Sequence, residues 1–94
     1  MKPNPNVRGS GMTTYQIRNA PKRAVFIWVN SDLSYPKTIA RKENREDLRI
    51  VSPSWLSEQT WRGLELSGVI VDHAAWLNDE QYTALENLRT RIFA

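Results

Sequence analysis

The chain has 94 residues and a net charge of +3, and its 40% hydrophobic and 24% charged residues are typical of one folded globular domain. It has no cysteine and one histidine, which excludes disulfides, thiolate metal sites and histidine clusters, so we expect no metal and no cofactor. The longest apolar run is far too short for a membrane helix and the start lacks an apolar signal core, which predicts a soluble, cytoplasmic protein.

Residues 1–12 are rich in Pro, Gly and Asn and offer almost nothing to bury. They are predicted to be a flexible tail, with Met12 as a candidate native start, ahead of a single α/β domain over 13–94. Polar and larger residues alternate in 13–18, which predicts a short edge strand. The stretch 23–30 is apolar without alternation, which predicts a central strand covered on both faces.

The middle of the chain contains a predicted helix, a strand and a second helix. The helix over 34–44 has a proline in its first turn and an inward stripe of Tyr35, Ile39 and Ala40. A shorter strand follows over 47–52. Serine caps and a first-turn proline then predict a helix over 52–61.

The last third contains a predicted strand over 66–72 and a helix over 78–94. The helix start is well specified, because Asn78 and Gln81 have the spacing of a capping box. Its expected buried stripe is Tyr82, Leu85, Leu88 and Ile92.

Strand and helix therefore alternate three times along the chain. This order predicts a parallel sheet with right-handed crossovers. The predicted fold is a small three-layer α/β domain with three to four mostly parallel strands, about three helices and strand order 2-1-3.

The charges are unevenly distributed. Residues 1–49 carry ten Lys or Arg against four acids, and residues 50–94 carry three against six. A basic face can attract phosphates or acidic partners, although an ordinary solvated helix has a similar composition. The candidate binding residues on this face are Lys37, Arg41, Lys42 and Arg45.

An acid at the end of an apolar strand, as in "VIVDHA", resembles the metal-holding strand of a nucleotide hydrolase. The chain lacks the GxxxxGK[ST] loop that such enzymes need to hold phosphates. Polar residues nevertheless collect at the carboxyl ends of the predicted strands, where open parallel sheets bind ligands. These strand-edge candidates are Ser31, Asp32, Ser52, Asp72 and His73, and capping and loop hydrogen bonds explain the same residues.

Four tryptophans are many for a chain of this length. Trp28 lies in the most apolar run and is predicted to be in the core. The others lie at or near helix ends, where aromatic side chains can anchor an interface or cover a thin core. These candidate interface aromatics are Trp55, Trp61 and Trp76.

The sequence "LRIVSPSWLSEQTWRGLEL" resembles the BRCT domain, whose last strand and helix often read as an apolar strand followed by Ser-Pro-x-Trp-Leu. The resemblance covers residues 25–66, and the order of elements is permuted, since the strand and helix comparable to the family's first pair come last. It implies a non-enzymatic domain that binds proteins, phosphopeptides or DNA ends. It also implies that Lys37 contacts phosphate, but the family's Ser/Thr-Gly pair is missing here.

The sequence leaves three functions open. The first is a non-enzymatic protein-interaction module that binds an acidic or phosphate-bearing partner, with a homodimer as one form of such binding. The second is a nucleic-acid-binding accessory protein that contacts the backbone through its basic residues. The third is a small hydrolase or nucleotide binder at the strand edge. No membrane partner is expected.

Overall fold

A computed structural model of the chain describes residues 11–58 and 60–93. It contains a parallel sheet of three short strands in the order β2-β1-β3. The strands are β1 (Val25–Ile27), β2 (Arg49–Val51) and β3 (Val69–Val71). The predicted α/β class, parallel pairing and strand order are confirmed.

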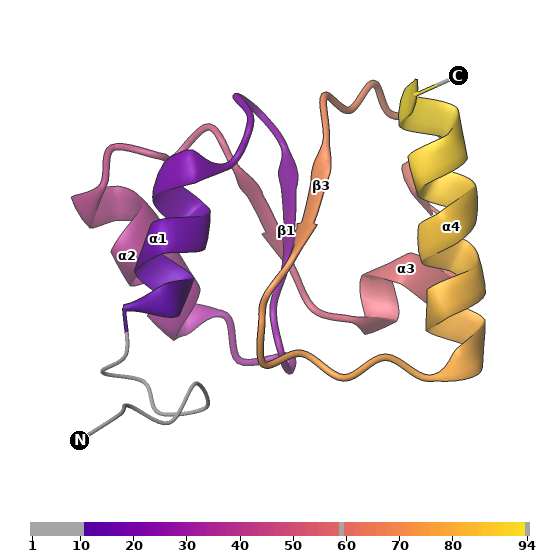
Figure 1. Ribbon diagram of the computed structural model, residues 1–94, viewed down its shortest axis with the longest axis horizontal. Coiled ribbons are helices and arrows are strands. Elements are labelled where there is room, and N and C mark those ends of the chain that lie inside the picture. Colours follow the sequence, from indigo (N-terminus) through magenta and orange to yellow (C-terminus); the bar gives the residue numbers. More distant parts are fainter. Residues whose placement is uncertain (1–10, 59, 94) are drawn as a thin grey trace.

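Helices cover both faces of this sheet, which gives three layers (Figure 1). One face carries α1 (Met12–Asn19) and α2 (Ser34–Lys42). The other carries α3 (Ser54–Glu58), the 3₁₀ turn η2 (Thr60–Gly63) and α4 (Asp79–Phe93). The crossover from β1 to β2 contains α2, and the crossover from β2 to β3 contains α3 and η2. The two crossovers run in opposite directions across the sheet, and their helices lie on opposite faces, as expected when both crossovers have the same hand.

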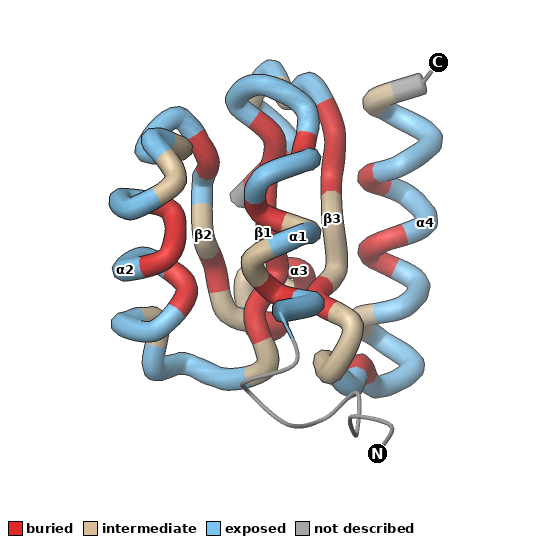
Figure 2. Tube along the Cα trace, turned by 60° about the vertical axis from the view of Figure 1, so that its left-hand side comes forward, coloured by how far each residue is buried: buried red, intermediate tan, exposed pale blue. Residues whose placement is uncertain are grey.

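The central strand β1 is buried on both sides, as its unbroken apolar run predicts (Figure 2). Val25 and Ile27 belong to a core cluster that includes Leu56, Leu85 and Leu88 from α3 and α4. Phe26 of β1 belongs to a second cluster beneath α1 and α2, together with the flanking Ala24 and Trp28 and with Ile17, Ile39, Ala40 and Leu48.

The prediction of an edge strand over 13–18 is wrong, because this segment forms the helix α1. Its buried residues Thr13 and Ile17 are four apart and share one helix face, whereas Tyr15 between them is exposed. The helix begins at Met12, the last residue of the predicted tail. The rest of that predicted tail, 1–10, lies outside the described residues.

The last helix begins as predicted. Asn78 Oδ1 accepts a hydrogen bond from the Gln81 amide at 2.8 Å, and Gln81 Oε1 accepts one from the Asn78 amide at 3.0 Å, which is a reciprocal capping box. The predicted inward stripe is wrong at Tyr82, which is exposed, and Ala84 is buried instead. Tyr35 on α2 is also partly exposed, and it stacks on Trp28 with ring centroids 5.7 Å apart.

Candidate functional site

The helix α2 presents three free basic side chains to solvent. Lys37, Arg41 and Lys42 are exposed, while Pro36, Ile39 and Ala40 on the other side of the helix are buried. Figure 2 shows this division, with the buried side of α2 turned toward β2. Within the described ranges, no carboxylate forms an ion pair with any of these three cations. They are therefore available for a partner.

A groove of about 180 Å³ lies between α2 and β2. Its floor is apolar and consists of Ala40, Leu48 and Ile50, of which the first two are buried and the third is half-buried. Charged side chains line the rest of it, namely Lys37, Arg41, Arg45 and Glu46. The groove thus combines apolar surface with a basic rim. The charge pattern indicated Lys37 and Arg41, but no sequence signal marked the floor.

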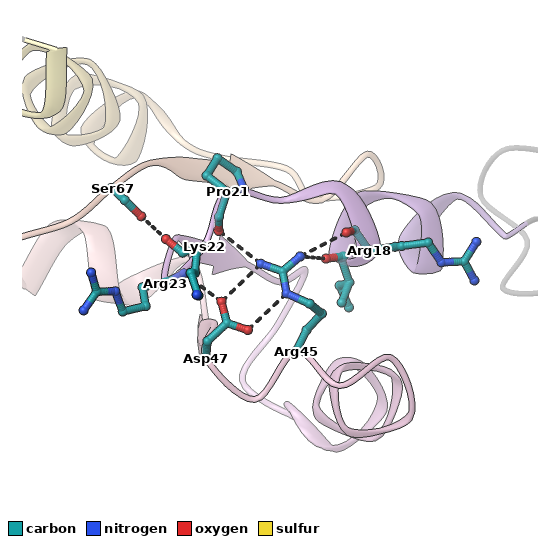
Figure 3. A network of polar contacts seen from close by, with 8 residues as sticks. Arg18, Pro21, Lys22, Arg23, Arg45, Asp47 and Ser67 are labelled. Carbon is teal, nitrogen blue, oxygen red and sulfur yellow. Dashed lines mark hydrogen bonds and ion pairs between the residues drawn. The ribbon is translucent and has the colours of Figure 1, made fainter.

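Arg45 lines the groove but is not part of the free basic face, which corrects that prediction. Its guanidinium donates hydrogen bonds to the carbonyls of Ile17, Arg18 and Pro21 at 3.0 to 3.2 Å, and so holds the end of α1 (Figure 3). It also binds both carboxylate oxygens of Asp47, at 3.0 and 3.2 Å. These contacts occupy the donors and neutralise the charge, so Arg45 acts as a structural residue.

The Asp47 carboxylate makes this network sensitive to acid. Its pKa is held well below the ordinary value, first by the side-chain hydrogen bonds from Arg45 and then by the Arg23 amide at 2.7 Å. A lowered folded-state pKa contributes stability above the pKa of the unfolded carboxyl, about 3.9, and that stability is lost as the pH falls toward the folded-state value.

We therefore expect the melting temperature of the wild type to fall more between about pH 5 and pH 2 than that of Asp47→Asn, because the variant lacks this titration. Thermal unfolding followed by circular dichroism across this range measures the difference. Parallel pH profiles of the two proteins would contradict the role of Asp47.

At the carboxyl ends of β1 and β2, the polar side chains serve local turns. Asp32 Oδ1 accepts hydrogen bonds from the amide and hydroxyl of Ser34 at 3.2 and 2.7 Å at the start of α2, and these bonds lower the pKa of Asp32. Ser52 and Ser54 share a hydrogen bond of 2.9 Å ahead of α3. Ser31 is exposed. This is the loop role that the sequence left open beside ligand binding.

At the end of β3, Asp72 is only 2% exposed, although the sequence makes it a candidate for ligand binding at the strand edge. Its carboxylate accepts hydrogen bonds from Thr13 Oγ1 at 2.9 Å and from the Ala74 amide at 3.0 Å. His73 is half-buried, with Nδ1 3.6 Å from Asp72 Oδ1 and 3.2 Å from Gln16 Oε1. Together these contacts fasten α1 to the end of β3, and burial keeps Asp72 from a ligand in solvent.

The three candidate interface tryptophans differ in exposure. Trp61 is 3% exposed and donates its indole N–H to the Leu56 carbonyl at 3.0 Å, so it belongs to the core and its prediction as an interface residue is wrong. Trp55 is half-buried against the same core cluster. Trp76 is 76% exposed in the loop before α4 and alone is open to a partner over most of its surface.

Comparisons with protein families, with curated proteins and with solved structures find no match to this chain. Across 11–58 and 60–93, no three His, Asp or Glu side chains are grouped so that they could hold a metal ion. None of the helices in these ranges is long and apolar enough to cross a membrane. The function must therefore be argued from the geometry of the domain.

Proposed function

We propose that this domain is a non-enzymatic protein-interaction module that binds an acidic partner at the groove between α2 and β2. The observation that carries the proposal is the apolar floor flanked by Lys37 and Arg41, neither of which forms an ion pair with a carboxylate of the described chain. Apolar burial supplies affinity at such a surface, and complementary charge speeds association and selects the partner.

The polar side chains at the carboxyl ends of the strands give less support to a catalytic function. Asp72 is buried and occupied by Thr13 and Ala74, and Asp32 is engaged by Ser34 at the start of α2. A nucleophile or general base must instead reach the substrate. Shifts in melting temperature with added nucleotides test this alternative, and a large shift would favour it.

The resemblance to BRCT domains supports the same class of function, because members of that family usually bind other proteins. It also suggests a phosphate-bearing partner, with Lys37 as the contact. The missing Ser/Thr-Gly pair speaks against a BRCT-like phosphate pocket. We therefore propose acidic side chains as the main recognised groups.

Nucleic acid is the second candidate partner, because exposed cations also lie outside α2, at Lys22, Arg23 and Arg49. Single strands are commonly bound by aromatic side chains that stack on bases, and none of the aromatic side chains that the structure describes lines the groove. Binding to DNA or RNA that weakens steeply with salt would favour this alternative.

The proposal is tested by affinity capture from the native host with the wild type and with the Lys37→Glu, Arg41→Glu double variant. Both side chains are exposed, so we expect the variant to melt within a few degrees of the wild type. We expect it to bind the captured protein at least about tenfold more weakly, a loss of ~1.4 kcal/mol. Unchanged affinity would remove the groove from the mechanism and leave the surface around Trp76 as the better candidate.

A further inference from the structure

The two outer edges of the sheet differ in how their backbone groups are satisfied. Along β3, the Gly68 carbonyl accepts from Val25 at 3.0 Å and the Asp72 amide donates to Ile27 at 2.9 Å, so these residues face β1. Because the pairing alternates along a parallel strand, Val69 and Val71 point their backbone groups outward. The outward carbonyl of Val71 is already occupied, since Gln16 Nε2 donates to it at 3.1 Å.

At the outer edge of β2, by comparison, the outward backbone groups are not occupied by any side chain that the structure describes. The Arg49 amide donates to Ala24 at 3.0 Å and the Val51 carbonyl accepts from Trp28 at 2.8 Å, so both residues face β1. By the same alternation, the N–H and C=O of Ile50 point outward. In the part of the chain that the structure describes, no strand lies on that side of β2. Unpaired edge groups of this kind are a template for an added strand.

The groove and the open edge share a residue, because Ile50 contributes both the outward backbone groups and part of the apolar floor. A strand paired with Ile50 would place alternate side chains beside Leu48 and between Lys37 and Arg41. Arg49 on the same strand is also exposed and forms no ion pair within the described ranges. This concentration of positive charge repels a second copy of the edge and attracts an acidic segment.

We infer that an extended acidic segment of a partner protein pairs with the outer edge of β2 as a fourth strand, with apolar side chains on the groove floor. This inference rests on the proposed function and adds to it the conformation and composition of the bound segment. Main-chain hydrogen bonds give affinity in such strand addition, and the pockets for alternate side chains give specificity.

The first test follows amide hydrogen exchange by NMR with a peptide of about ten residues in which Thr takes every second position and Val and Glu alternate at the positions between, so that one face carries both apolar and acidic side chains. We expect saturation with this peptide to slow exchange at the Ile50 amide at least about tenfold, while the outward amide of Val69 on β3 is unchanged. Unchanged exchange at Ile50, or failure of the peptide to bind, would overturn strand addition. Protection of Ile50 that rises with protein concentration in the absence of peptide would instead identify a second copy as the occupant, and would also overturn it.

The second test uses two further peptides of the same sequence, one N-methylated at every threonine and the other at every valine and glutamate. Only alternate residues of an added strand donate to its neighbour. We therefore expect one methylated peptide to bind at least about tenfold more weakly than the other, a difference of ~1.4 kcal/mol. Equal affinities would contradict strand addition.

The failures of the two proposals are distinguishable. If the methylated peptides bind equally but the captured partner still loses affinity for Lys37→Glu, Arg41→Glu, the strand pairing is wrong and the acidic partner stands. If the captured partner binds that double variant with unchanged affinity, the groove has no role and both proposals are wrong.

Discussion

Replacing Trp28 with alanine is expected to lower the free energy of unfolding by about 3 to 5 kcal/mol, the largest loss among the substitutions considered. Trp28 is 2% exposed and follows the central strand β1. Its ring stacks with Phe26 at 6.5 Å and with Tyr35 at 5.7 Å between centroids. Truncation would leave a cavity beneath α1 and α2, and a loss of this size approaches the total stability of many small domains.

Chemical denaturation measures this loss, with Trp76→Ala as the matched control. Trp76 is 76% exposed, so the same truncation there is expected to change stability by less than about 0.5 kcal/mol. Equal denaturation midpoints for Trp28→Ala and the wild type would show that the α1 and α2 layer does not depend on this ring.

Replacing Asp72 with alanine is expected to cost about 2 to 4 kcal/mol, because the Thr13 hydroxyl and the Ala74 amide each lose their acceptor. Asp72→Asn should cost less, since its side-chain oxygen can still accept from one of these donors. Denaturant unfolding of both variants measures the order. Wild-type stability for Asp72→Ala would contradict a structural role for this buried carboxylate.

The sheet was predictable because the sequence patterns that specify it lie within short segments and are strong. The unbroken apolar run around Phe26 requires cover on both faces, and the alternation of strands and helices then favours parallel pairing. The start of α4 was predictable for the same reason, since Asn78 and Gln81 satisfy each other within one turn.

The helix α1 was not predictable from its own residues, because a short segment with Thr13, Tyr15 and Ile17 fits both the strand and the helix spacing. The contacts that help hold it are distant in sequence. Thr13 reaches Asp72 across 59 residues, and Arg45 reaches the Ile17 carbonyl across 28. Neither pairing leaves a local pattern.

The candidate site was predictable only in its charges. A basic stretch does not reveal that Arg45 is occupied by Asp47 and three carbonyls while Arg41 remains free. Tryptophans at helix ends are equally ambiguous, since Trp61 lies in the core and Trp76 lies in solvent. Which polar or aromatic side chain is free depends on tertiary contacts, and those follow from the packed layers.

The groove is tested most directly by the affinities of Arg41→Glu and Lys42→Glu for the captured partner. Both residues are exposed in the last turn of α2 and both changes reverse one charge, but only Arg41 lines the groove. We expect Arg41→Glu to weaken binding at least about fivefold more than Lys42→Glu, a difference of ~1 kcal/mol. Equal losses would show that the partner responds to the overall charge of the helix, and would contradict binding in the groove between α2 and β2.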